Sequence, residues 1–244
     1  YGSQLERSPR GHVDSGLGKG PALGSPGIAE PTRTITTTGE TLTIDGVDFI
    51  FQNAPGSEAP AELTFYLPQH KAFCGAEVVS RNMHNLYTLR GAQVRDARKW
   101  SGYIDEAIGL FPDTEVYFAS HHWPLWGNAA IMEFLKKQRD GYRFIHDQTL
   151  RLAALGYTPK EIAEQLQMPE SLRSSFPNRG YYGTLKHNAK AVYQRYFGWY
   201  DGNPANLDPL PPQATARKAI EYMGGADAVL ERARADYAKG EYRW

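Results

Sequence analysis

The chain has 244 residues, of which 41% are hydrophobic and 12% aromatic, so it carries enough apolar side chains for a packed core and is not a disordered chain. Its 27 basic and 27 acidic residues give a formal net charge of zero, which argues against a dedicated nucleic-acid-binding protein. No apolar run approaches the roughly 18–20 residues of a membrane span, and a lone cysteine, Cys74, excludes an intrachain disulfide. The chain opens on Tyr1 with no signal-peptide pattern, which is typical of a processed product or an internal segment.

The first part of the chain changes from irregular to strand-like. Residues 1–35 are rich in glycine, proline and serine, and we expect a flexible tail there. A long loop over a substrate site is the alternative, since structureless loops beyond about 12–15 residues are usually functional or disordered. Alternation of apolar and polar residues over 41–52, with a turn at Asp45-Gly46, predicts a hairpin. A second hairpin is expected from residues 62–67 and 71–75.

Helical spacing of apolar residues then takes over. It predicts an amphipathic helix over 86–111, a short buried strand at 116–119 and a helix that begins near Asn128, a residue suited to the N-cap. Past residue 147 every expected element is helical, including a capped helix that begins with Thr158-Pro159-Lys160-Glu161. Further helices are expected at 184–197, 213–223 and 226–239. We therefore predict an α/β region over 36–146 and an all-α region over 147–244.

Several residues with metal-binding side chains follow predicted strands. His121 and His122 come after the strand at 116–119, and imidazole is a common metal ligand near neutral pH. Neighbours in an extended chain face opposite ways, so at most one of the pair points into a given site. Glu58 and Glu77 each follow a strand and lie beside small residues. A Glu, Glu, His set suits a divalent cation such as zinc, whereas for each glutamate alone a solvated loop position is the alternative.

An anion site is expected next to these residues. Asn85 and Arg90 lie where the helix after Glu77 is predicted to begin, and a helix N-terminus with an arginine fork attracts sulfate, phosphate or carboxylate. The alternative is that Arg90 and Arg95 are surface helix residues paired with nearby carboxylates.

Four longer strings carry a resemblance to a known family. PGSEAPAE (55–62), MHNLYTLRGAQVRDARKW (83–100), FASHHWPLWGN (118–128) and YQRYFGWYDGNPANL (193–207) resemble the alkyl sulfatases of the metallo-β-lactamase superfamily. The resemblance implies part of a zinc-binding αββα sandwich followed by an all-helical dimerisation domain, and hence a homodimer. The change of pattern near residue 147 agrees with that layout.

The resemblance also implies roles for individual residues. Glu58 matches the ligand to a first zinc, Glu77 the carboxylate that bridges two zincs, and His122 the ligand to the second, with His121 the less favoured neighbour. Arg90 matches the arginine that holds the sulfate group. The further candidates for sulfate contacts are Asn85, Tyr182 and His187.

One family motif does not occur in this sequence. The THxHxDH string that supplies the family's other zinc ligands is absent, so the chain looks truncated on its N-terminal side, and we expect it to be inactive alone. The complete enzyme is expected to hold two zincs and to hydrolyse linear primary alkyl sulfates, such as dodecyl sulfate, to a fatty alcohol and sulfate. The sequence leaves open the catalytic residues, the choice between C–O and S–O cleavage, and the compartment (periplasmic, secreted or cytoplasmic).

Two other functions fit parts of the sequence. The chain is an inactive dimerisation scaffold if no other segment supplies HxHxDH. Alternatively, residues 157–172 have the pattern of a helix-turn-helix that binds DNA through its second helix. That second segment offers few basic residues, which favours dimerisation over DNA binding.

Overall fold

A computed structural model describes Ser8, residues 27–89 and residues 91–244. The chain divides into two compact units, of which the larger ends at Gly198 and the smaller runs from Trp199 to Trp244. Of the predicted flexible tail, only Ser8 and residues 27–35 are among the described residues, and they form no helix or strand. The rest of that prediction lies outside the described residues.

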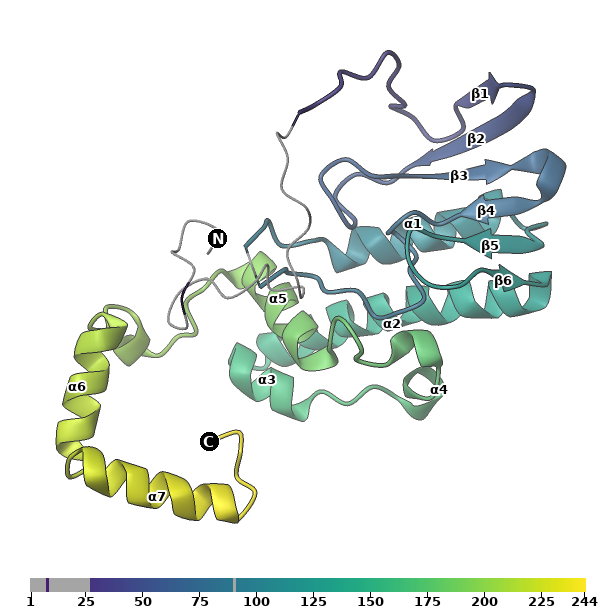
Figure 1. The fold of residues 1–244 in the computed structure, drawn as a ribbon. Coiled ribbons are helices and arrows are strands. Elements are labelled where there is room, and N and C mark those ends of the chain that lie inside the picture. The colour runs from purple at the N-terminus through teal and green to yellow at the C-terminus, as the bar shows by residue number, and fades with distance from the viewer. Residues whose placement is uncertain (1–7, 9–26, 90) are drawn as a thin grey trace. The chain divides into compact units, whose positions relative to one another are not determined.

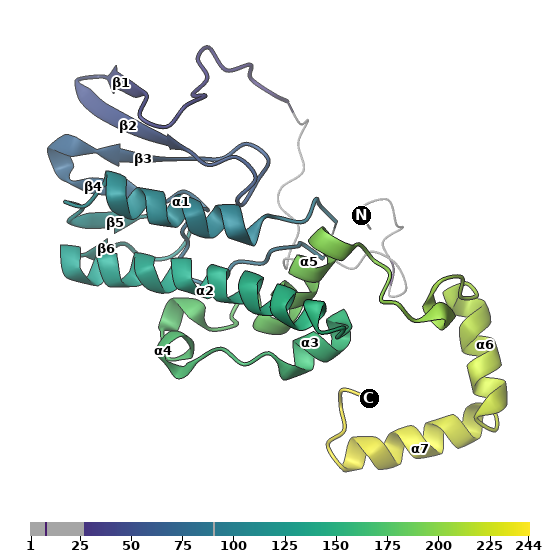
Figure 2. The same cartoon turned by 180° about the vertical axis from the view of Figure 1, so that it is seen from behind.

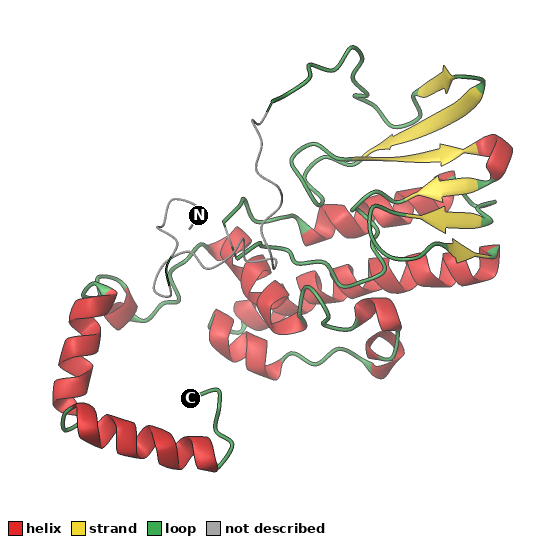
Figure 3. Ribbon diagram, viewed as in Figure 1, coloured by secondary structure: helices red, strands yellow, loops and turns green. Residues whose placement is uncertain are grey.

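Six strands of the larger unit form one sheet, in which they follow one another in chain order (Figures 1 and 3). They are β1 (Thr41–Ile44), β2 (Val47–Asn53), β3 (Leu63–Leu67), β4 (Ala72–Cys74), β5 (Val116–Phe118) and β6 (Leu125–Trp126). Neighbouring strands are antiparallel except β4 and β5, which are parallel and are joined through a helix. Asp45 and Gly46 take positive φ angles of 51° and 81°, which confirms the predicted two-residue hairpin turn. The second predicted hairpin is also confirmed and turns through η1 (Pro68–His70).

Two long helices, α1 (Ala97–Leu110) and α2 (Asn128–Ala154), cover one face of the sheet (Figure 2). The core between the layers contains large side chains with no exposed surface, among them Trp100, Tyr117 and Ile131. The rings of Tyr117 and Phe134 meet edge to face at 5.0 Å, so β5 packs directly on α2.

The other face of the sheet is aromatic. The Phe65 ring lies 5.3 Å from that of Phe49 and 6.0 Å from that of Phe118. Because successive strand residues point to opposite faces, these phenylalanines point away from the α1–α2 layer. No helix in the described part of the chain covers them, so this part shows one sheet and one helical layer of the sandwich that the resemblance implies.

We predicted that a helix begins near Asn85, and this predicted start is wrong. α1 begins only at Ala97, where the Asp96 side chain accepts hydrogen bonds from the backbone N–H groups of Arg98 and Lys99 at 3.0 Å each. The preceding segment is irregular, with Gly91 at a φ of 99°. Asn85 therefore opens no helix.

Every described element that begins after residue 147 is helical, as we expected. Residue 147 lies inside α2, which runs unbroken for 27 residues. The helices α3 (Pro159–Gln165), α4 (Glu170–Arg173) and α5 (Leu185–Phe197), with the short turn η2 (Phe176–Asn178), follow α2 in the same compact unit. The capping box of Thr158 and Glu161 is present as predicted.

The smaller unit contains η3 (Pro204–Asn206) and two helices, α6 (Pro212–Tyr222) and α7 (Ala226–Ala238). Gly224 and Gly225 separate the helices with φ angles of 95° and 94°, which fits their predicted role as a helix stop. No residue of α6 or α7 is buried. Among the described helices of the whole chain, none is long and apolar enough to cross a membrane.

Candidate metal centre

Glu58 lies in the loop that follows β2. The loop is closed by hydrogen bonds from the Ala54 N–H to the Glu62 carbonyl at 2.8 Å and from the Gly56 N–H to the Ala59 carbonyl at 2.9 Å. The buried Ser57 hydroxyl donates to the Ala54 carbonyl at 2.6 Å. These contacts fix the backbone on both sides of Glu58, whose side chain is only 12% exposed.

Glu77 follows β4 on a tight turn. Gly75 donates its N–H to the Phe118 carbonyl at 2.8 Å, and Ser120 donates to the Ala76 carbonyl at 3.1 Å, so the end of β4 is tied to the end of β5. A Cβ on Gly75 would lie 2.7 Å from the Tyr117 hydroxyl, so only glycine fits there. The turn places the Glu77 carboxylate at the exit of the sheet.

His84 is the buried histidine of this region, with 3% of its surface exposed. Its N–H donates to the Tyr142 hydroxyl at 3.1 Å, and its carbonyl accepts from the Asn188 side-chain amide at 2.9 Å. Nδ1 lies 3.0 Å from the Asn85 carbonyl. Nδ1 also lies 3.2 Å from Arg95 Nη1. We assign the hydrogen on Nδ1 to the shorter contact, with the Asn85 carbonyl, which can only accept, and this leaves the lone pair on Nε2. Burial lowers the pKa of His84 to about 4, so its ring is neutral near pH 7.

The three side chains converge. Glu58, Glu77 and His84 each offer one ligand atom, and these atoms lie within 4.8 Å of one another. Burial chiefly raises the pKa of the nearby Glu62, and the negative charges of Glu58 and Glu77 add to that rise. Two carboxylate oxygens and a neutral imidazole nitrogen are ligands that zinc accepts. The residues therefore fit a divalent cation of borderline softness, and we call them the Glu58 group.

Arg95 fixes one member of the Glu58 group. It forms an ion pair with the Glu58 carboxylate and also donates to the Glu58 backbone carbonyl. Its Nη1 donates to the backbone and side-chain oxygens of Asn85 at 2.8 and 2.6 Å. The Arg95 side chain is 11% exposed, so Arg95 is not the surface helix residue that we considered as an alternative.

The two adjacent histidines have different contacts from those that we predicted. His121 contacts the Glu77 carboxylate through Nε2 and is largely exposed. His122 has a φ of 70°, and its Nε2 lies 3.0 Å from the Asn82 side-chain nitrogen. The structure therefore does not bring His122 into the Glu58 group. The strand ends at Phe118, so strand alternation no longer decides which histidine faces the carboxylates.

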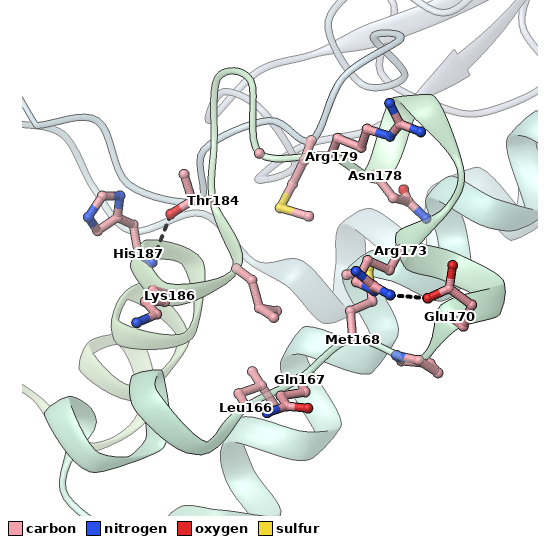
Figure 4. Close-up of a pocket in the computed structure, with 14 residues that line it drawn as sticks. Leu166, Gln167, Met168, Glu170, Arg173, Asn178, Arg179, Thr184, Lys186 and His187 are labelled. Carbon is pink, nitrogen blue, oxygen red and sulfur yellow. Dashed lines mark hydrogen bonds and ion pairs between the residues drawn. The ribbon is translucent and has the colours of Figure 1, made fainter.

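The predicted sulfate-binding residues do not all lie at the same site. Asn85 borders the Glu58 group through Arg95, and the Tyr182 ring meets the His84 ring edge to face at 4.9 Å. His187 lines a separate pocket, where its backbone N–H donates to Thr184 Oγ1 at 3.3 Å (Figure 4). The prediction for Arg90 lies outside the described residues.

Sequence reasoning missed two residues of the centre, His84 and Arg95. Both belong to the string MHNLYTLRGAQVRDARKW, which we had used only for the resemblance and the anion site. The signal that was available is a histidine seven residues after Glu77, a candidate metal ligand, in an irregular stretch. Its burial depends on α5, which local pattern does not show.

The chain is similar to alkyl sulfatases over its whole length. Residues 158–244 match the family profile described as alkyl sulfatase dimerisation. The alkyl/aryl-sulfatase BDS1 of Saccharomyces cerevisiae is 58% identical over 245 residues, which cover 100% of this chain and 38% of that protein. A linear primary-alkylsulfatase of Pseudomonas sp. is 49% identical, with 100% of this chain and 36% of that protein covered.

A solved structure gives the same result. The stereoselective inverting sec-alkylsulfatase Pisa1 from Pseudomonas sp. superposes with a TM-score of 0.89 at 44% identity, covering 100% of this chain and 39% of that one. The chain thus spans less than two fifths of the length of these relatives. Its mixed sheet and its helical region both match the corresponding part of an alkylsulfatase. On this similarity the chain belongs to the alkyl sulfatase family.

Proposed function

We propose that this chain is part of a zinc-dependent alkyl sulfatase and supplies acidic ligands to its metal centre. The convergence of Glu58, Glu77 and His84 within 4.8 Å carries this proposal, because a carboxylate pair with an imidazole is a ligand set for zinc. The similarity to proteins named as alkylsulfatases supports the choice of a sulfate ester as substrate. His122, which the resemblance implies as a ligand, is a further candidate for the complete centre.

The described side chains have distinct parts in such a centre. Glu58, Glu77 and His84 would hold the zinc, and a zinc held there would supply an acidified water and polarise an oxygen of the ester. Arg95 holds the Glu58 carboxylate in one orientation, and the Nδ1 hydrogen bond of His84 directs Nε2 away from the Asn85 carbonyl. Tyr182 packs its ring on His84 and limits the access of water to that side of the group. Asn85, Tyr182 and His187, with Arg90, remain our candidates for sulfate contacts.

The substrate that we propose is a linear primary alkyl sulfate, which would yield a fatty alcohol and inorganic sulfate. Relatives are named for primary and for secondary esters, so the primary ester is the finer part of the proposal. We also propose that the chain alone does not turn over, because the sequence contains no HxHxDH string to complete two zinc sites. The complete centre is proposed to hold two zincs.

The test is release of sulfate from decyl sulfate with zinc supplied. We expect none from the chain alone, and we expect release after mixing with the separately produced remainder of the yeast relative, which this chain does not match. Turnover by the chain alone would contradict the proposed incompleteness. Zinc binding without turnover in the mixture would support the proposal that this chain supplies zinc ligands and would contradict the proposal that it takes part in catalysis.

A homodimer through the helical region is the second part of the proposal. The dimerisation profile covers residues 158–244, and in the smaller unit large apolar side chains such as Tyr222, Leu230 and Tyr237 are 87%, 51% and 71% exposed. Exposed apolar residues grouped on two helices favour an interface. A dimerisation scaffold without catalytic activity would also form this homodimer. Zinc binding by the Glu58 group distinguishes the enzyme from such a scaffold.

DNA binding is disfavoured by the geometry of the helix-turn-helix candidate. Its second helix, α4, has only four residues, and Leu172 within it is buried. A recognition helix must enter the major groove and present several side chains to the bases. A single helical turn does not do so.

A further inference from the structure

The larger unit contains a pocket that no part of the Glu58 group lines. It has a volume of about 1110 Å³ and lies between residues 166–173 and residues 178–187 (Figure 4). This is at the upper limit of the roughly 300–1,000 Å³ of small-molecule sites. We call it the Met168 pocket. The described residues that line it are Met83, Leu166, Gln167, Met168, Pro169, Glu170, Arg173, Asn178, Arg179, Gly180, Thr184, Leu185, Lys186 and His187.

One part of the lining is apolar and fixed. Met83, Leu166 and Met168 are 4%, 7% and 6% exposed, and all three also belong to the hydrophobic core. Leu185 packs against the same core. The unbranched methionine side chains adapt to flexible apolar ligands. This part of the pocket therefore suits a hydrocarbon chain.

The lining also carries an excess of positive charge. Among the described residues of the lining, Glu170 is the only carboxylate, and it pairs with Arg173. Lys186 pairs at 2.8 Å with Glu164, which lies outside the lining. Arg179 donates to the Tyr181 hydroxyl at 3.3 Å and to the Ser174 carbonyl at 3.5 Å, and neither partner is charged. Arg179 thus provides a positive charge that these contacts do not neutralise.

The Met168 pocket and the Glu58 group include residues that are neighbours in the sequence. Met83, which lines the pocket, precedes His84, and its carbonyl accepts a hydrogen bond from the Gly183 N–H at 2.7 Å. A Cβ on Gly183 would lie 2.4 Å from the His84 carbonyl oxygen, so the two segments are in direct backbone contact. The same two segments form a wall of both the pocket and the group.

We propose that the Met168 pocket binds the hydrocarbon chain of a single-chain amphiphile whose anionic head lies at Arg179. The apolar lining, the volume and the excess of positive charge together fit a ligand with one long chain and one negative head. An alkyl sulfate has this chemistry, and its choice as the amphiphile rests on the proposed function. Binding itself needs no metal, since Glu58, Glu77 and His84 are not in the lining.

The experiment is calorimetric titration of the full chain, in EDTA and below the micellar concentration, with hexyl, octyl and decyl sulfate. Burial of one methylene predicts affinity that rises about three- to fourfold per added carbon. Octanol should bind more weakly than octyl sulfate, and sodium sulfate should show no saturable binding. Affinity that does not depend on chain length would overturn the proposal.

Paired variants place the ligand in the pocket. Gln167→Trp fills the opening and should weaken decyl sulfate binding at least about tenfold, whereas Gln165→Trp, on an exposed residue outside the lining, should not. Arg179→Gln should weaken decyl sulfate but not decanol, and Arg151→Gln should change neither. Equal affinities in all four variants would show detergent bound elsewhere and would overturn the proposal. Since no step uses zinc, loss of zinc binding with intact decyl sulfate binding would count against the metal centre alone.

Discussion

The side-chain amide of Asn188 joins α5 to the metal centre by donating to the backbone carbonyl of His84 at 2.9 Å, across 104 residues of sequence. Its oxygen accepts from the Leu86 N–H at 2.9 Å, so one buried side chain satisfies two backbone groups on either side of Asn85. The helical region therefore takes part in forming the Glu58 group. The distant residues that hold His84 come from α2 and α5.

Removal of this amide should loosen the centre. Asn188→Ala leaves a buried N–H and a buried carbonyl without partners, and we expect a loss of about 2–4 kcal/mol in the free energy of unfolding. Zinc affinity should fall with it. Urea denaturation gives the free energy, and Lys190→Ala, on an exposed residue of the same helix, is the matched control. Equal midpoints for the two variants would show that the Asn188 contacts do not support the fold.

A glycine substitution tests the backbone contact behind His84. Gly183→Ala places a Cβ 2.4 Å from the His84 oxygen and 2.6 Å from the Asn85 nitrogen, so the two segments must separate. We expect destabilisation of about 1–3 kcal/mol or more, together with weaker zinc binding. Gly102→Ala is the control, because its Cβ meets nothing within 4 Å and alanine favours helix α1. A Gly183→Ala variant as stable as Gly102→Ala would refute the close approach.

Histidine resonances identify the imidazole that binds the metal. On titration of the chain with zinc, long-range ¹H–¹⁵N spectra should show the Nε2 signal of His84 moving, because Nε2 carries the free lone pair. The signals of His70 and His187 serve as internal controls, since neither belongs to the Glu58 group. A shift of His122 with an unchanged His84 would assign the ligand role as the resemblance implies and not as the structure places it.

The smaller unit should mediate self-association. Leu230→Glu introduces a charge on a half-exposed apolar position of α7, and we expect it to weaken the dimer at least about tenfold. Arg232→Gln, two residues away, also lowers the net charge by one and controls for that change. Sedimentation equilibrium over a range of concentrations measures the effect. A wild-type chain that stays monomeric at high concentration would contradict the proposed homodimer. A dimer unaffected by Leu230→Glu would show that the interface lies elsewhere.

Local signals in the sequence predicted those parts of the fold that depend on neighbouring residues. The Asp45-Gly46 turn and the Thr158 capping box act within four residues, and both are present. The stretch before α1 was mispredicted because Leu86 has helical spacing, yet its burial comes from contact with α5. The expected change to helices near residue 147 involves no break in the chain, since α2 extends from the sheet layer into the helical region.

The candidate site was predicted in part for the same physical reason. Glu58 and Glu77 follow β2 and β4, neighbouring strands of β3, so their convergence follows from strand ends meeting at one edge. His84 lies in no regular element, and its position is set by Tyr142 and Asn188 from distant helices. No pattern within a short window contains those contacts.

The most direct test of the account is the zinc affinity of the metal-stripped chain and of its Glu58→Gln and Glu77→Gln variants, measured by calorimetry. Each variant keeps the shape of the side chain and removes its negative charge, while Glu133→Gln on the exposed side of α2 is the control. We predict that the control binds zinc like the wild type and that each of the other two binds at least about tenfold more weakly, because a direct ligand is lost. Wild-type affinity in both Glu58→Gln and Glu77→Gln would contradict the proposal that these carboxylates form a metal centre.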